Sequence, residues 1–129
     1  MLDSSLPSLS EPTATLAAGT VLLHRGDVVD RIVHVMQGRV VLGVMGAMGH
    51  GDMAHQLGVV EGPFWLEAAS GLMDLPHVVD AVAETEVQVQ YVRVPDFVAQ
   101  VRALPEASQT LLMDMARSQR QQTELAVSR

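Results

Sequence analysis

The chain has 129 residues, 48% of them hydrophobic, as expected for a single globular domain with its own core. It contains no cysteine, which excludes disulfides, zinc–thiolate sites, iron–sulfur clusters and thiol catalysis. The net charge is −7 and the eight basic residues, all arginine, form no cluster, so we expect no direct nucleic-acid binding by this chain.

The N-terminal residues have the composition of an unstructured segment. Residues 1–14 are rich in Ser, Pro and Thr and lack the basic and apolar regions of a secretory signal, so we expect a flexible arm. No apolar run in the sequence approaches the roughly 20 residues that a membrane-spanning helix needs. We therefore expect a cytoplasmic protein that makes no membrane contact.

Glycine turns separate short β-branched runs in the next part of the chain. Val21–Leu23 and Ile32–Met36 have the composition of strands, and Gly26 and Gly38 follow them in sequences typical of tight turns. Short strands joined by glycine turns at nearly regular spacing predict a β-barrel or β-roll.

The strand pattern continues with a glycine-rich connection. We expect Val40–Met45 to pair with Ile32–Met36 or to continue its strand, and Ala47–Asp52 to form a hairpin tip. Gln56–Val60 then leads into a turn at Gly62-Pro63.

Helical signals appear in the second half of the chain. Phe64–Leu72 contains helix formers and predicts a short helix, whereas Val78–Ala83 and Val87–Val94 return to strand-like alternation. Pro95 suits the first turn of a helix, and Pro105 opens a last helix that runs to near the C-terminus. The predicted fold is mainly β: a double-stranded β-helix, or jelly-roll-like β-roll, over residues 15–103, with short helices and a long C-terminal helix over residues 104–129.

The last helix carries a heptad-like seam. Its members are Leu104, Ser108, Leu111, Met115, Ser118, Gln122 and Leu125. Such a stripe packs either on the helix's own β-roll or on a second helix in a dimer. The predicted dimer-interface residues are Leu104, Leu111, Met115 and Leu125.

The turns and strands together resemble the cyclic-nucleotide-binding domain of the CRP/FNR family of bacterial transcription regulators. The resemblance lies in a Gly19-Thr20 entry, an Arg25-Gly26-Asp27 turn, a hydrophobic strand and a Gly38-Arg39-Val40 turn, and it extends to the C-terminus. It implies an effector-sensing regulatory domain that forms a homodimer through its last helix. In that family the long helix leads into a winged helix-turn-helix, and the chain ends at Arg129, so we expect signalling through a partner and not through its own DNA-binding element.

The resemblance also implies a ligand site. The family's phosphate-binding cassette has a glutamate that holds the ribose hydroxyl and, about ten residues later, an arginine that pairs with the cyclic phosphate. Glu67 falls at the glutamate position and His77 at the arginine position. Leu66 replaces the cassette glycine, and Val78 and Val79 replace small or hydroxyl residues. A histidine lacks the permanent charge and the planar fork with which arginine binds phosphate.

Three interpretations of this segment stay open. The predicted ligand-binding residues are Trp65, Leu66, Glu67, Ala68, His77, Val78 and Val79. In the first interpretation these residues bind a cyclic nucleotide, and in the second they bind another effector in a more apolar pocket. In the third they have lost the ligand, and the roll is a scaffold for protein interaction or dimerisation. His77 is interpreted as a polar substitute at a cassette position in preference to a haem ligand, so no cofactor is assigned.

Other chemistry finds little support. His50, Asp52 and His55 could bring three ligands together, but no fourth ligand is apparent, so no metal site is predicted. The sequence has no nucleophile elbow, phosphate-binding loop or dinucleotide fingerprint. We therefore expect a protein that is not an enzyme.

Overall fold

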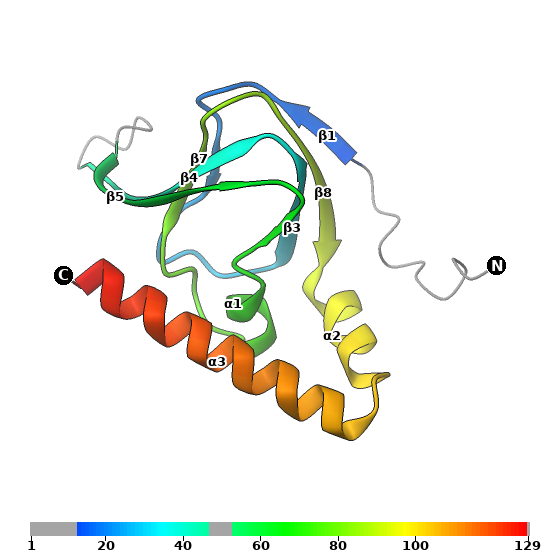
Figure 1. Cartoon of the computed structure of the whole chain (residues 1–129). Helices are drawn as coiled ribbons and strands as arrows, with labels where there is room; N and C mark the ends of the chain where they lie inside the picture. Colours follow the sequence, from blue (N-terminus) through cyan, green and yellow to red (C-terminus); the bar gives the residue numbers. More distant parts are fainter. Residues whose placement is uncertain (1–12, 47–52, 129) are drawn as a thin grey trace.

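The computed structural model describes residues 13–46 and 53–128, which form a β-roll with a long helix across its open side (Figure 1). Its strands are β1 (Thr13–Leu16), β2 (Val21–Leu23), β3 (Arg31–Gln37), β4 (Arg39–Met45), β5 (Met53–Glu61), β6 (Phe64–Leu66), β7 (Asp80–Ala83) and β8 (Val87–Arg93). Its helices are α1 (Ala68–Met73), α2 (Val94–Arg102) and α3 (Glu106–Ser128). Most of the predicted arm, the predicted hairpin tip and two of the three histidine-cluster residues, His50 and Asp52, lie outside the described residues. Strand β1 begins two residues inside the range that was predicted as arm.

The strands form two antiparallel sheets of four strands each. The strand orders are β1-β8-β3-β6 and β2-β7-β4-β5. Neighbours in each sheet are mostly distant in sequence, as in a roll whose chain crosses repeatedly between two sheets. The prediction of a mainly β fold with a jelly-roll-like β-roll and a long C-terminal helix is confirmed.

The prediction that Val40–Met45 pairs with Ile32–Met36 or continues its strand is wrong in both forms, because β3 and β4 lie in different sheets. Strand β4 pairs with β5 and β7, whereas β3 pairs with β6 and β8. The chain passes from one sheet to the other at Gly38, whose φ is 103°. A Cβ at this glycine would lie 2.5 Å from the carbonyl oxygen of Glu86, so the crossing requires a residue without a side chain.

The core lies between the sheets and consists mainly of valine. Val35, Val40 and Val89 are completely buried, and each such side chain contributes roughly 1.5–3 kcal/mol by leaving water. Strand β8 buries Val87 and Val89 and exposes Gln88 between them, as its alternation predicts. β-Branched residues pack well on a pleated surface, which is why these runs form strands.

The predicted helix over Phe64–Leu72 is correct only in its second part. Residues Phe64–Leu66 form β6, which pairs with β3, and α1 begins at Ala68. Leu66 is 1% exposed in the core. The long-range pairing with β3 therefore overrides the local helix propensity of this segment.

The two C-terminal helices begin at prolines, as predicted. Pro95 lies in the first turn of α2, and α3 begins directly after Pro105. Helix α3 crosses below the roll and packs against α1, burying Ala116 (Figure 1). The four predicted dimer-interface residues are exposed in the single chain: Leu104 by 42%, Leu111 by 62%, Met115 by 59% and Leu125 by 62%. Among the described residues, no helix combines the length and apolarity needed to cross a membrane.

Candidate functional site

The carboxylate of Glu67 is the centre of the candidate site. Its Oε1 accepts hydrogen bonds from the backbone N–H of Val78 at 2.8 Å and from Ser70 Oγ at 3.0 Å. The same oxygen lies 3.3 Å from Nδ1 of His77. The side chain is 12% exposed. The structure thus brings together Glu67, His77 and Val78, which the resemblance placed in one segment, and we call residues 67–79 the cassette.

Two residues with left-handed backbone delimit α1. Glu67 precedes the helix with a φ of 54°, and Asp74 follows it with a φ of 55°. Residues other than glycine adopt the left-handed backbone conformation at a cost of about 1–2 kcal/mol. At Glu67 the hydrogen bonds of the carboxylate offset that cost, so the conformation and the buried bonds depend on one another.

The surroundings of Glu67 favour its charged form. Burial alone would raise the pKa of the carboxyl, but the hydrogen bonds from His77, Val78 and Ser70 and the charge of His77 outweigh burial. The pKa of Glu67 therefore lies below its ordinary value of 4.5. A carboxylate of lowered pKa stabilises the fold above the unfolded pKa, and this contribution disappears as pH falls through the folded pKa.

We expect Glu67→Gln to remove one part of the acid sensitivity of the fold. The difference in melting temperature between the unchanged chain and the variant should be largest near neutral pH and shrink below about pH 4.5. Calorimetric scans of both proteins between about pH 7 and pH 3 measure this difference. A difference that stays constant over the whole range would contradict the assignment.

Backbone bonds hold His77 against the first glycine turn. The N–H of Gly26 donates to the carbonyl of His77 at 2.9 Å, and the N–H of His77 donates to the carbonyl of Asp27 at 3.0 Å. The buried carboxylate of Asp80 accepts the N–H of Arg25 at 2.7 Å and that of Met45 at 2.8 Å. Because both oxygens of this carboxylate accept backbone N–H groups, Asp80 connects the Arg25-Gly26 turn to β4.

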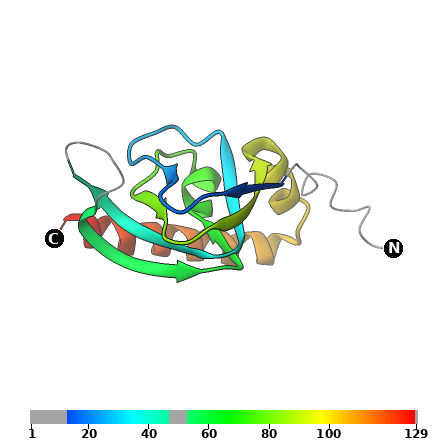
Figure 2. The same ribbon diagram turned by 90° about the horizontal axis from the view of Figure 1, so that it is seen from above.

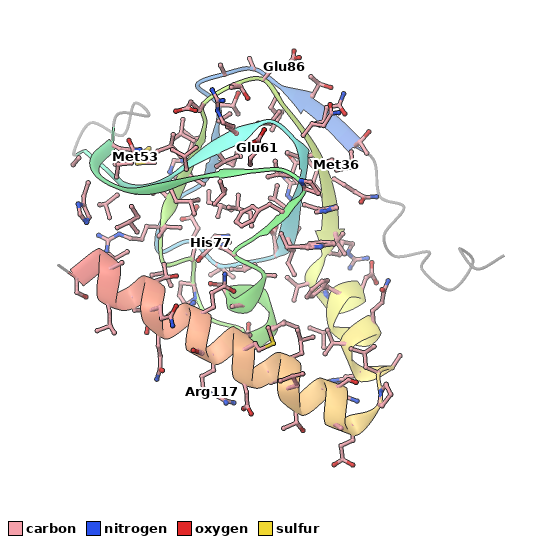
Figure 3. The ribbon with its side chains drawn as sticks, viewed as in Figure 1. Met36, Met53, Glu61, His77, Glu86 and Arg117 are labelled. Carbon is pink, nitrogen blue, oxygen red and sulfur yellow. The ribbon has the colours of Figure 1, made fainter. Side chains whose placement is uncertain are left out.

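Helix α3 supplies an arginine to the cassette. Nη1 of Arg120 donates to Ser70 Oγ at 2.8 Å and to the carbonyl of Pro76 at 2.7 Å. The Arg120 side chain is only 10% exposed, and its Nε lies 3.3 Å from Oε2 of Glu124 without forming a hydrogen bond. Figure 3 shows His77 between the roll and α3, on the side of the helix from which Arg120 reaches the cassette.

The sequence interpretation missed Arg120. The signal that could have found it is the row of α3 residues facing the roll: Arg120 follows the buried Ala116 by four residues and precedes the half-buried Thr123 by three. An arginine within such a row must find polar partners on the element that it faces.

Little space remains between Glu67 and Arg120. The gap lined by Leu66, Glu67, Val79 and Arg120, among others, has a volume of about 50 Å³. Small-molecule sites are roughly 300–1,000 Å³. Two larger clefts adjoin it: one of about 380 Å³ between β5 and α3, which run alongside each other in Figure 2, and one of about 580 Å³ between the Arg25-Gly26 turn and the end of α3.

The other predicted site residues are distributed differently. Leu66 and Val79 belong to the core and line the small gap, and Ala68 is the half-buried first residue of α1. Trp65 is not part of the Glu67 cluster: it stacks on His34 at 4.2 Å between ring centroids and contacts Phe97 of α2 at 5.5 Å. Within residues 13–46 and 53–128, no three His, Asp or Glu side chains are grouped as a metal site requires.

Among known proteins, the similarity is to solved structures that share this fold. No protein-family model and no curated protein matches the sequence. Among solved structures, the N-terminal domain of a transcriptional regulator from Streptomyces coelicolor A3(2) is 28% identical, with a TM-score of 0.65, and the match covers 95% of this chain and 81% of that one.

Two further structures contain the same roll within longer proteins. The catabolite activator protein of Thermus thermophilus is 20% identical, with a TM-score of 0.68, over 94% of this chain and 56% of its own. The cAMP-bound EAL enzyme Bd1971 is 13% identical, with a TM-score of 0.71, over 85% of this chain and 29% of its own. The chain thus spans about a third to a half of these two proteins. With its two four-stranded sheets, its cassette and its long closing helix, the chain has the β-roll fold of the cyclic-nucleotide-binding domains of CRP-type regulators.

Proposed function

We propose that the chain is an effector-sensing regulatory domain, not a catalytic one, in which a small molecule acts at the cassette and α3 carries the signal. The observation that supports this most directly is the bonding of Arg120. One guanidinium nitrogen on α3 is bonded to both Ser70 and Pro76 of the cassette. Any ligand that moves those groups must also change how α3 is held. We also propose that the signal leaves the domain through α3 and not through a DNA-binding element within residues 1–129.

The solved structures of similar fold support a small-molecule effector. One is described as bound to cAMP, another as bound to cGMP, and a third as a putative cAMP-binding regulatory protein. In this chain the cassette position that the resemblance gives to arginine holds His77, and Arg120 brings a guanidinium to the cassette from a different element. Cyclic nucleotides are therefore the first ligands to test, and the cassette chemistry admits other anions.

Hydrogen exchange of α3 tests the proposal. An effector should change the exchange rates of amides near Arg120 and raise the melting temperature; at 100 times its dissociation constant a ligand stabilises the fold by about 2.7 kcal/mol. Titrations with cAMP, cGMP and cyclic dinucleotides provide the first panel. A ligand that binds and leaves α3 exchange unchanged would refute the coupling.

The output that we propose is dimerisation through the exposed seam of α3. Leu111→Ser and Leu125→Ser should each weaken self-association by about tenfold, because each removes an apolar side chain from a two-helix contact. Gln121→Ser, at an exposed position off the seam, is the matched control. Sedimentation equilibrium measures the association. A chain that remains monomeric at high concentration, or dimers unaffected by both leucine variants, would contradict the seam assignment.

A ligand-free scaffold is the second candidate, favoured by one observation. The gap lined by Glu67 and Arg120 is only about 50 Å³, and Oε1 of Glu67 is bonded to its own chain. This candidate predicts no melting-temperature change with any small molecule and an α3 that binds only protein.

A further inference from the structure

A cleft beside the cassette lies outside the small gap, at the end of α3. It has a volume of about 580 Å³. Its lining combines three segments: Arg25 and Gly26 from the first glycine turn, His77 and Val78 from the cassette, and Arg120, Glu124, Val127 and Ser128 from α3. The cleft thus touches the cassette and the helix that carries the proposed signal.

The two arginines of this cleft differ in their partners, and neither is fully hydrogen-bonded. The side chain of Arg25 makes no hydrogen bond or ion pair with the described residues; only its backbone N–H is bonded, to Asp80. Arg120 is nine-tenths buried, yet its Nε has no hydrogen-bond partner. Glu124 supplies the only carboxylate among the described lining residues; it is 52% exposed and forms an ion pair with that Nε at 3.3 Å. The described lining therefore holds two guanidinium groups and one half-exposed carboxylate, which pairs with Arg120 and not with Arg25.

We propose that this cleft binds a small organic anion whose carboxylate or phosphate group is held by Arg25 and Arg120. Guanidinium groups bind both kinds of anion through charge-assisted hydrogen bonds, and neither the Arg25 side chain nor Nε of Arg120 forms a hydrogen bond with the described residues. This inference rests on the proposed function, since it names the class of effector that acts on the link between Arg120 and the cassette.

The size and walls of the cleft select a metabolite-sized acid. A volume of about 580 Å³ falls within the range of small-molecule sites and exceeds what an inorganic ion fills. Val78 and Val127 offer apolar surface to a short carbon skeleton, and the hydroxyl of Ser128 offers one further polar contact. The ligand therefore combines an anionic group with a few carbon atoms.

Binding should tighten α3 against the roll. An anion shared by Arg25 and Arg120 would connect the end of α3 to the glycine turn, adding a second link to the one that Arg120 makes with Ser70 and Pro76. Bonds present only in the bound state favour the docked position of the helix. We therefore expect slower amide exchange in the second half of α3 when the cleft is filled.

The test is calorimetric titration of the full chain with succinate and with glycerol 3-phosphate, against sodium chloride at equal ionic strength. These two probes distinguish a carboxylate ligand from a phosphate ligand. Arg25→Gln should weaken binding of the preferred probe by about tenfold without lowering the melting temperature, because the Arg25 side chain makes no hydrogen bond or ion pair with the described residues. Arg117→Gln is the matched control, since Arg117 projects from the side of α3 away from the roll (Figure 3) and, in the part of the chain that the structure describes, pairs only with Asp114.

Two results would overturn the anion cleft: neither probe binds beyond the chloride control, or Arg25→Gln binds as tightly as the unchanged chain. Hydrogen exchange on the same samples separates this inference from the proposed function. Anion binding that leaves α3 exchange unchanged supports the cleft and refutes the coupling. A response of α3 to a cyclic nucleotide without anion binding supports the coupling and refutes the cleft.

Discussion

Glu67→Ala is expected to lower the free energy of unfolding by about 3 kcal/mol. The substitution removes the acceptor of the Val78 N–H and of the Ser70 hydroxyl, and it removes the charge beside His77. Hydrogen bonds to a charged group contribute roughly 1.5–3 kcal/mol, and buried donors left without partners add to the loss. Alanine also keeps the left-handed backbone at position 67 without the bonds that offset it. Urea unfolding measures the change.

Glu84→Ala provides the matched control for this experiment. Glu84 also accepts a charge-assisted bond, from Arg39 Nε at 2.8 Å, but its side chain is 41% exposed. An exposed ion pair contributes about 0–1 kcal/mol, so this variant should change stability little. If Glu67→Ala costs no more than Glu84→Ala, the Glu67 carboxylate does not hold the cassette together.

The strands and turns were predictable because their signals are local. Apolar runs between glycines identify β2 and β3, and strand-like alternation identifies β7 and β8, without any knowledge of their partners. Gly38 could be assigned to a turn because few other residues adopt a φ of 103°. Proline likewise marked the starts of the last two helices, since its fixed φ and missing N–H suit only the first turn.

Pairing could not be predicted from the same signals. Val40–Met45 follows Ile32–Met36 after a single turn, which is also how a hairpin is arranged, and only the crossing at Gly38 sends the two strands to different sheets. β6 has three residues and is held by its partner β3. Its conformation depends on contacts about thirty positions away in sequence, which local propensity does not contain.

The site was predictable in its spacing and not in its bonding. The spacing of ten positions from Glu67 to His77 was enough, through the resemblance, to place the two in one segment. The sequence could not indicate that the carboxylate is bonded to its own chain, because that depends on the backbone at Val78 and the turn around α1. It also could not indicate that α3 returns Arg120 to Ser70, a contact between residues fifty positions apart.

Arg120→Met is expected to separate the cassette from α3. Methionine keeps most of the apolar stem that packs between helix and roll, so the change isolates the polar contacts. Two charge-assisted bonds are lost, and the carbonyl of Pro76 is left without its donor, so opening of α3 should become easier by about 1–3 kcal/mol. Since about 1.4 kcal/mol corresponds to a factor of ten, amide exchange around position 120 should accelerate by about 5- to 150-fold.

Arg117→Met is the matched control for Arg120→Met. Arg117 is 55% exposed and bonded within the helix to Asp114, so its loss should leave α3 exchange nearly unchanged. If Arg120→Met exchanges no faster than Arg117→Met, the helix is held by apolar contacts alone, and a ligand at the cassette has no bonded route to α3. If exchange accelerates in α3 and in residues 67–79 together, the guanidinium joins the two into one cooperative unit. The effector-sensing role requires this second result, because a cassette that opens independently of α3 cannot bias the helix between two positions.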